Sequence, residues 1–428
     1  MKKIKIKNLG PIKNFEMDIK RFNILIGPQA SGKSTIAKAL FVVNSVQKEL
    51  IKYIKNISNE DEKRHLLRNF NKSLKWLFIN TFGSIENKDN FEIIYELNDK
   101  DCIMFYFKNG RIMIHFSDNL KDEIESIKNE ISLLMSVEKK LFLNPLDENL
   151  LSRKSYIYGL IDKKINNIFQ NELSFDYIPA GRNLLTILAE QLGNIDISSL
   201  DLITKTFIKK IISLKNLFYQ DLDSIIESHK RFSSQKIDFV RVNLAKETIY
   251  KVLKGIYKID NGQELIHLKD GSNVKINFAS SGQQEALWIL NLIFYSILYN
   301  LKLFTVIEEP EAHLYPVAQK EIVELIALFG NKNNNQVLIT THSPYILSAF
   351  NNLIYAGNIY KQKKEALFIK KEISINFNDV NVFMIAEGKG YSILDYEIKQ
   401  IKVEEIDKVS GILNQEYEKL LSLEFSND

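Results

Sequence analysis

The stretch Gly27-Pro28-Gln29-Ala30-Ser31-Gly32-Lys33-Ser34-Thr35 decides how the rest of this chain is interpreted. It fits the pattern G-x4-G-K-[ST], in which the glycines let the backbone turn tightly so that its N–H groups face phosphate oxygens. The apolar run Phe22–Ile26 before it predicts a strand, and residues 34–50 predict a helix whose N-terminus also favours phosphate. A glycine-rich turn that matched by chance would lack both flanks, so the stretch predicts a phosphate-binding loop.

Each residue type in this loop suits a separate part of a bound phosphate chain. Lys33 brings a positive charge to the β- and γ-phosphates, so we expect it to be catalytic, and Ser34 offers its hydroxyl to Mg²⁺ as a metal ligand. The predicted nucleotide-binding set is Gly27, Gln29, Ala30, Ser31, Gly32, Lys33, Ser34 and Thr35.

Two adjacent carboxylates end a second apolar run. Residues 303–307 predict a strand, and Glu308 and Glu309 follow it directly. The order resembles a Walker B strand, whose end places one carboxylate near Mg²⁺ and the next near the γ-phosphate. We expect Glu308 to be a metal ligand, directly or through water because it stands where Asp is usual, and Glu309 to be the general base. Two solvated acids at a surface strand end are the alternative, but the continuation Pro310-Glu311-Ala312-His313-Leu314 is too specific for it.

Two further segments place polar residues at the ends of predicted elements. Residues 279–285, Ala-Ser-Ser-Gly-Gln-Gln-Glu, precede a buried helix over 283–298 and suit either a second anion cradle or an ordinary helix cap. Residues 337–344 predict an apolar strand that ends in two hydroxyls and His342. A lone histidine is usually structural, but at the end of the strand after the carboxylate pair we expect it to sense the γ-phosphate.

The order of these four segments resembles an ABC-type ATPase head of the SMC, RecF and overcoming-lysogenisation-defect class, over residues 1–50 and 270–355. The resemblance implies an α/β fold, a P-loop NTPase head with a mixed sheet and a compact helical insertion, with ATP and Mg²⁺ as cofactors. In that class two heads sandwich two ATP molecules. Ser281, Gly282 and Gln283 are therefore implied to bind nucleotide as the signature motif, although the family's LSGGQ reads SSGQQ here, and His342 to occupy the switch position.

The segment Tyr177-Ile178-Pro179-Ala180-Gly181-Arg182 stands between two helical stretches. It resembles the I-P-A-x-R segment of small phage-defence-associated AAA family ATPases. Two interpretations stay open: Arg182 presents its guanidinium to phosphate, or it is a solvated residue in a turn.

We expect four parts along the chain. They are a first ATPase lobe with the P-loop and a strand-rich arm (1–119), a helical insertion (120–260), a second ATPase lobe with the signature, Walker B and switch histidine (261–371), and a C-terminal tail (372–428). After three predicted strands within residues 4–26, the arm of the first lobe contains three more, Phe91–Leu97, Cys102–Phe107 and Arg111–Phe116, the last two joined by a hairpin turn at Asn109-Gly110. The insertion is broken at Pro145 and Pro179 and holds no sustained heptads, which excludes a long coiled coil.

The composition is that of an ordinary globular chain. Its 428 residues are 45% apolar and 26% charged, and Lys+Arg minus Asp+Glu is 57 − 53 = +4, so nucleic acid would have to be held by a local patch. Cys102 is the single cysteine, which fits a reducing compartment. The N-terminus lacks a signal-peptide core, and the longest apolar run, 286–301, is interrupted by polar residues. We expect that run to be a buried helix, and the protein to be cytoplasmic without membrane contact.

These observations predict an ATPase that forms a homodimer or higher oligomer. We expect a sensor or regulator in bacterial anti-phage defence that controls a separate nuclease or toxin effector, encoded by an adjacent gene. The alternative is a RecF-like DNA-repair or recombination ATPase, with lysine-rich stretches 205–215 and 361–371 as nucleic-acid contacts. A built-in nuclease is not expected, because Glu387 is not followed by an Asp-x-Asp pair and Asp395 and Asp407 are isolated.

Overall fold

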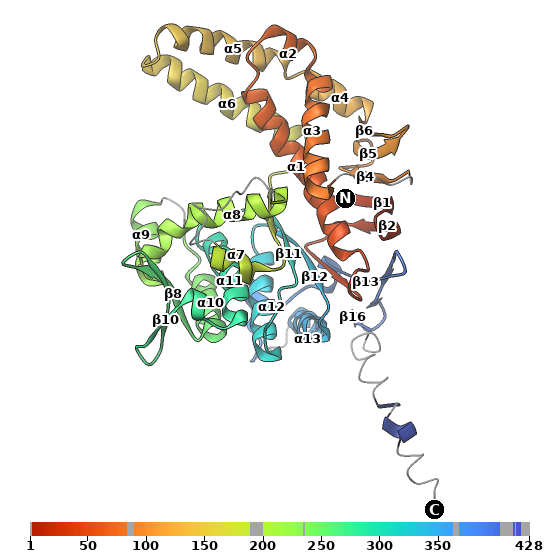
Figure 1. Cartoon of the computed structure of the whole chain (residues 1–428), viewed down its shortest axis with the longest axis vertical. Helices are drawn as coiled ribbons and strands as arrows, with labels where there is room; N and C mark the ends of the chain where they lie inside the picture. Colours follow the sequence, from red (N-terminus) through yellow and green to blue (C-terminus); the bar gives the residue numbers. More distant parts are fainter. Residues whose placement is uncertain are drawn as a thin grey trace, which may run out of the picture.

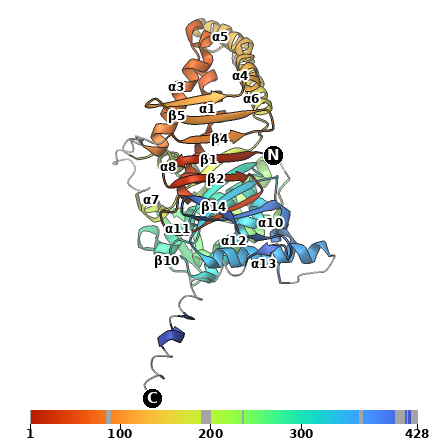
Figure 2. The same cartoon turned by 90° about the vertical axis from the view of Figure 1, so that its right-hand side faces the viewer.

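The computed structural model describes residues 2–83, 90–188, 200–233, 236–362, 368–402, 414–415 and 417–420. An eleven-stranded sheet runs through the molecule in the order β6-β5-β4-β1-β2-β14-β13-β3-β12-β11-β7. Figure 2 shows five of these strands, β5, β4, β1, β2 and β14, one above another. The expected α/β class with a mixed sheet is confirmed. The strands are β1 Lys3–Leu9, β2 Ile12–Asp18, β3 Phe22–Ile26, β4 Glu92–Glu96, β5 Cys102–Lys108, β6 Arg111–Phe116, β7 Ser174–Ile178, β11 Leu303–Glu308, β12 Gln336–Thr341, β13 Val380–Ala386 and β14 Lys389–Ser392.

Five neighbouring strands, β13, β3, β12, β11 and β7, run parallel. Every residue of β3 and of β11 is buried, as expected for strands covered on both faces. Because parallel strands end at the same edge, the loops after β3, β11 and β12 meet there, although the first lies hundreds of positions before the other two in the chain.

Helices cover both faces of this parallel half. Side chains alternate along each strand, so Ile24, Ile307 and Ile339 join one core, and Leu25, Val306 and Leu338 join the other. The first core is closed by α10 (Phe239–Leu253), α11 (Ser281–Leu298), α12 (Pro316–Gly330) and α13 (Pro344–Lys361). The second is closed by α1 (Lys33–Lys55) and α3 (Leu66–Phe82), which adjoin the short α2 (Glu60–Arg64).

On the other side of the large sheet, β6, β5, β4, β1 and β2 pair antiparallel, and β14 pairs with β2 in parallel and with β13 in antiparallel orientation. An arm of helices rises beyond these strands (Figure 1). The hairpin at Asn109-Gly110 is confirmed, with φ values of 53° and 74° that suit a two-residue turn. The arm contains α4 (Asp118–Glu125), α5 (Lys128–Leu143) and α6 (Glu148–Ile168), the last two packed against each other as a hairpin.

A second group of elements surrounds the first core. It comprises α7 (Arg182–Leu188), α8 (Leu202–Lys215), α9 (Leu222–Phe232) and a three-stranded sheet of β8 (Gly255–Asp260), β9 (Gln263–Leu268) and β10 (Asn273–Lys275). The apolar run at 286–301 lies mostly in α11, which is buried as predicted. Within the described ranges, no helix is both long enough and apolar enough to cross a membrane.

Two strands lie where the sequence pattern indicated something else. The stretch around residue 177 forms β7, which pairs parallel with β11 at the edge of the sheet. The strand expected at 382–385 is β13, but it continues into the hairpin strand β14, followed by the short pair β15 (Leu394–Asp395) and β16 (Gln400–Ile401). The division of the chain into four parts remains a prediction, and its insertion and tail each contribute strands to the central sheet.

Candidate nucleotide-binding site

The loop between β3 and α1 has glycine where a side chain could not fit. A Cβ atom on Gly27 would lie 2.2 Å from the carbonyl oxygen of Ile385 in β13, because the loop passes directly beside that strand. Gly32 adopts a φ of 105°, and its Cβ would lie 2.4 Å from Ile12 Cδ1. The tight turn predicted from the sequence pattern is therefore required by both the packing and the backbone.

Lys33 is the first residue of α1, and its side chain lies back along the loop. The ammonium donates to the carbonyl oxygens of Gly27 and Pro28, at 2.8 Å each, and lies 3.4 Å from His342 Nδ1. Burial lowers the pKa of Lys33, while the carboxylates of Glu309 and Glu311 oppose that shift. The loop thus holds a cation directly beside the predicted switch histidine.

The two carboxylates at the end of β11 have different surroundings. Glu308 is buried; its Oε2 accepts a hydrogen bond from the N–H of Ala180 at 3.5 Å, and within the described residues no hydrogen bond reaches its Oε1. Burial, and then the charge of Glu308, raises the pKa of Tyr177 well above its usual value. Glu309 is half-exposed and turns away from the strand with a φ of 44°.

His342 connects the loop cation with the second carboxylate. Its Nε2 lies 3.0 Å from Glu309 Oε1, while its Nδ1 faces Lys33. Its backbone N–H and the Thr341 hydroxyl both donate to Glu311 Oε1 at 2.7 Å. The structure therefore brings the three residues predicted to be catalytic into one continuous line, Lys33–His342–Glu309.

Glu311 is a site residue to which the sequence pattern assigned no role. Its carboxylate fixes the backbone of β12 at the point where His342 leaves the strand. The available signal was the spacing, since Glu309 and Glu311 both follow the strand end within one tight turn. The left-handed backbone that makes this turn, at Glu309 and again at His313 (φ 59°), is not readable from residue type.

The residues present fit Mg²⁺ and a nucleoside triphosphate. Glu308 offers a buried carboxylate oxygen that accepts no hydrogen bond from the described residues, and Ser34 is exposed at the start of α1. Two oxygen ligands suit Mg²⁺, which keeps several waters and substrate oxygens in its shell. No group of three or more His, Cys, Asp or Glu side chains suited to a metal occurs among the described residues. The remaining loop residues of the predicted nucleotide-binding set, Gln29, Ala30, Ser31 and Thr35, lie in the same turn or the first turn of α1, with Gln29 and Ala30 exposed.

The predicted signature segment, residues 279–285, includes the N-cap and the first turn of α11. Ser280 caps the helix and shares a capping box with Gln283, whose Nε2 also donates to the carbonyl oxygen of Leu253 at 2.7 Å. Ser281 is exposed, and a Cβ on Gly282 would lie 2.7 Å from the carbonyl oxygen of His313. Within the described residues, no hydrogen bond joins this segment to the P-loop. Both the helix-cap interpretation and an outward-facing anion cradle are compatible with this geometry.

Neither sequence-based interpretation of Arg182 is correct. The residue is 0% exposed, so it is not solvated, and its guanidinium donates to backbone carbonyl oxygens and to Glu285 and not into the nucleotide loop. The reason is the strand β7, which the helical pattern of its neighbours concealed and which carries the turn inside the molecule.

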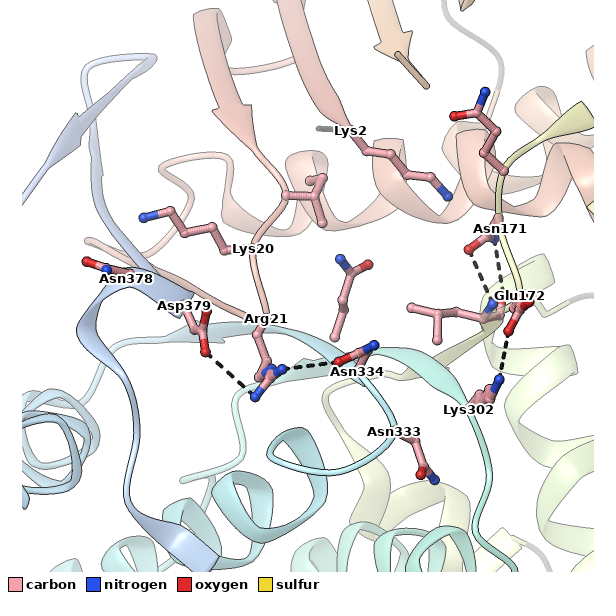
Figure 3. A pocket seen from close by; sticks show the side chains of 14 residues that line it. Lys2, Lys20, Arg21, Asn171, Glu172, Lys302, Asn333, Asn334, Asn378 and Asp379 are labelled. Atoms are coloured by element: carbon pink, nitrogen blue, oxygen red, sulfur yellow. Dashed lines mark hydrogen bonds and ion pairs between the residues drawn. The ribbon is translucent and has the colours of Figure 1, made fainter. Parts of the chain in front are cut away.

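A pocket of about 620 Å³ lies at the opposite edge of the sheet, where the parallel strands begin (Figure 3). Its cations are mostly engaged within the chain: Arg21 lies 3.6 Å from Asp379, and Lys302 lies 2.7 Å from Glu172. This pocket is separate from the loop cluster at the carboxyl edge, which carries the candidate chemistry.

Comparisons with solved structures find SMC heads at low similarity. The Smc head bound to the C-winged helix domain of ScpA is 12% identical, covers 92% of this chain and 98% of its own, and has a TM-score of 0.41. The SMC head domain from Thermotoga maritima is 10% identical, covers 91% and 97%, and has a TM-score of 0.36. The Smc head with a coiled coil and joint from Pyrococcus yayanosii is 11% identical, covers 96% and 100%, and has a TM-score of 0.40.

A search of curated proteins found no match to the sequence. The comparison with protein families matches residues 1–347, about four-fifths of the chain, to the family described as the AAA ATPase domain. That range contains the P-loop, both carboxylates and His342, which the fold brings together at one edge of the sheet. The chain belongs to the AAA ATPase domain family.

Proposed function

We propose that the chain binds ATP with Mg²⁺ and hydrolyses it in the manner of an ABC-type head. The observation that carries this proposal is the line Lys33–His342–Glu309, with His342 lying 3.4 Å from the cation and 3.0 Å from the carboxylate. A loop cation, a strand-end carboxylate and a histidine between them form a set that phosphoryl transfer uses for charge stabilisation and for positioning the nucleophile.

Each residue has a separate role in this proposal. ATP with its metal would supply the scissile phosphoanhydride and the charge that neutralises it. Lys33 would exchange its two loop carbonyls for phosphate oxygens, and Ser34 and Glu308 would hold the metal. Glu309 would accept a proton from water at its carboxylate, and His342, bonded to that carboxylate through Nε2, would keep it oriented and report the nucleotide state.

We infer that the active assembly is at least a homodimer. Ser281 is exposed at the N-terminus of α11, while Gly282 and Gln283 are fixed by the turn after β11 and by the helix cap. A rigid segment whose exposed face does not contact its own P-loop is suited to complete the nucleotide site of a second copy.

We further propose that nucleotide state controls a separate effector protein, in phage defence. The helical hairpin α5–α6 supports this because its tip exposes large apolar side chains, with Phe142 at 87%, Leu143 at 83% and Leu146 at 86%. The alternative DNA-binding function has less support in the stretch 205–215, since Lys210 and Lys215 form ion pairs with Asp176 and Glu264. A salt-dependent mobility shift with duplex DNA would favour the alternative, and co-purification with the product of an adjacent gene would favour an effector.

The ATPase proposal is tested with Lys33→Ala. Removing the charge should weaken nucleotide binding by about 1.5–3 kcal/mol, roughly 10- to 100-fold in Kd by calorimetry, and abolish phosphate release. Lys52→Ala, at an exposed position of the same helix, is the matched control and should behave as the unaltered chain. Equal affinities in both variants would contradict the P-loop assignment.

A further inference from the structure

The guanidinium of Arg182 lies where three segments distant in the sequence meet. Its Nε donates to the carbonyl oxygen of Glu285 at 2.9 Å, and its Nη1 donates to those of Pro179 at 2.7 Å and Glu308 at 2.6 Å. Its Nη2 donates to the carbonyl oxygen of Glu309 at 2.9 Å and lies 3.2 Å from the Glu285 carboxylate. Four backbone carbonyl oxygens thus accept hydrogen bonds from this completely buried side chain, and the Glu285 carboxylate forms an ion pair with it.

Glu285 stabilises the backbone at Arg182 through hydrogen bonds to its carboxylate. It is 2% exposed, and its carboxylate accepts the backbone N–H groups of Arg182 at 3.2 Å and Asn183 at 3.1 Å. Glu285 belongs to the first turns of α11, the helix that the signature residues Ser281 and Gly282 begin. Any displacement of that helix start is therefore transmitted to the guanidinium.

The other end of the network holds the backbone of the predicted general base. Glu309 has a left-handed φ of 44°, a conformation that non-glycine residues adopt only when their surroundings impose it. Two contacts impose it here: its N–H donates to the carbonyl oxygen of Thr340 at 2.8 Å, and its own carbonyl oxygen accepts from Arg182. The direction of the Glu309 carboxylate toward His342 depends on this backbone.

We propose that Arg182 is a positioning residue that couples the start of α11, the predicted signature, to Glu309. When a second copy docks on the signature, this coupling would change the position of the Glu309 carboxylate in the same chain. The inference rests on the proposed function, since it assigns Arg182 to that reaction. Arginine is required because its three nitrogens donate to four carbonyl oxygens, whereas lysine has three donors on a single nitrogen. The burial of a charge inside an ATPase head is then explained by its role as a link.

The test compares Arg182→Lys with Thr186→Val. Lysine keeps the charge beside Glu285 but loses the planar fork. Thr186 is a matched control, because it is also fully buried in α7 and donates to the carbonyl oxygen of Gln284 in α11, at 3.2 Å. Among the described residues its side chain forms no hydrogen bond to the end of β11. With ATP, Arg182→Lys should lower kcat by about 10²-fold while the nucleotide Kd changes less than about threefold, and Thr186→Val should leave both unchanged.

Hydrogen exchange without nucleotide supplies a readout that does not need hydrolysis. Peptides spanning 305–315 should exchange faster in Arg182→Lys than in the unaltered chain or Thr186→Val, while peptides from β5 and β6 stay unchanged. If Arg182→Lys exchanges faster everywhere, the isosteric variant Glu285→Gln is tested in its place. It should raise the exchange rate of residues 280–292 and lower kcat.

The outcomes separate this inference from the proposed function. Equal exchange at 305–315 in Arg182→Lys and Thr186→Val, or equal losses of kcat in both, would overturn the coupling role. An unaltered chain that does not hydrolyse ATP, with faster exchange confined to 305–315 in Arg182→Lys, would refute the ATPase proposal while supporting the link between α11 and Glu309.

Discussion

Neighbouring glutamates at the end of β11 point in different directions because their backbone conformations differ. Glu308 still belongs to the strand and points into the protein near Tyr177, whereas Glu309 has turned with a φ of 44° and reaches His342. A left-handed non-glycine residue costs of the order of 1 kcal/mol or more, so the surrounding hydrogen bonds must hold it. Strain of this kind is common where a side chain has to be aimed.

Glu309→Gln should therefore retain ATP binding and lose hydrolysis by about 10²- to 10⁴-fold, because the amide is nearly isosteric but cannot accept a proton. Glu308→Gln should instead weaken the binding of Mg²⁺, so that ATP binding and hydrolysis require a higher Mg²⁺ concentration. Phosphate release and calorimetry at varied Mg²⁺ concentration distinguish the two variants. Should Glu308→Gln be the variant that binds Mg-ATP without hydrolysis, while Glu309→Gln stays active, the roles assigned here are reversed.

Glu311→Gln tests whether the orientation of His342 matters. Both hydrogen bonds, from the Thr341 hydroxyl and the His342 N–H, reach the same carboxylate oxygen at 2.7 Å, and a neutral amide oxygen in its place would accept them more weakly. We expect kcat to fall about 10- to 100-fold with little change in Kd. Glu16→Gln, at a half-exposed position of β2, serves as the control. A variant with full kcat would show that Glu311 only stabilises the turn.

At the scale of the elements, the start of α11 packs against the turn that follows β11. Aspartate at 282 would damage this contact inside one chain, since a Cβ there lies 2.7 Å from the carbonyl oxygen of His313. A loss of dimers in Gly282→Asp would therefore not be specific to an interface. The exposed Ser281, one position earlier, is the better place to test a sandwich.

Ser281→Glu should leave ATP binding by the single chain intact and prevent nucleotide-driven pairing. A carboxylate on that exposed face would repel the triphosphate of the second copy. Light scattering with ATP on the Glu309→Gln background measures the effect, with Ser281→Ala as the matched control. An ATP-dependent dimer that persists with glutamate at this position would refute the sandwich.

Trp288→Ala tests the buried packing of α11. Trp288 is 0% exposed and stacks edge-on against Phe218 and Tyr257, so its truncation should destabilise the fold by about 3–5 kcal/mol. The chain contains two tryptophans, and the second, Trp76, is 56% exposed in α3. Denaturant unfolding of Trp76→Ala should differ from the unaltered chain by about 0.5 kcal/mol or less. Comparable losses in the two variants would contradict the packing described for α11.

At the scale of the whole molecule, the tail completes the ATPase sheet instead of forming a separate unit. Its strand β13 pairs with β3 beside the P-loop, and Glu387 lies with Gly388 in the two-residue turn between β13 and β14, with φ values of 53° and 81°. The Glu-Gly pair therefore forms the turn of a β-hairpin. Asp395 lies in the short strand β15, and Asp407 lies outside the described residues.

The purified chain, free of any co-purifying protein, should therefore leave plasmid, single-stranded DNA and tRNA intact in Mg²⁺ or Mn²⁺, with and without ATP. Gel assays of the products check this expectation. Cleavage that survives Glu309→Gln and disappears with Glu387→Ala would place a nuclease site in the tail and would contradict the effector-controlling function.

Local patterns were sufficient for much of this molecule. The glycine spacing and its flanks predicted the P-loop between β3 and α1, the apolar runs predicted β11, β12 and the buried α11, and the order of the motifs predicted the family. These features are encoded over a few adjacent residues, because turn geometry, strand burial and helix capping depend on local residue type. Lys33, Glu309 and His342 could be named for the same reason.

Contacts between distant segments decided the rest. The sequence around β7 predicts a break between helices, and the segment becomes a strand only by pairing with β11. The strand β14 follows a turn in which Glu387 has a positive φ, which its residue type does not predict. The sequence pattern offers only solvent or phosphate as partners for Arg182, because the carbonyl oxygens that accept from its guanidinium belong to residues up to 127 positions away. Burial and partners of a polar side chain are properties of the packed molecule, so the link between the signature helix and Glu309 appears only in three dimensions.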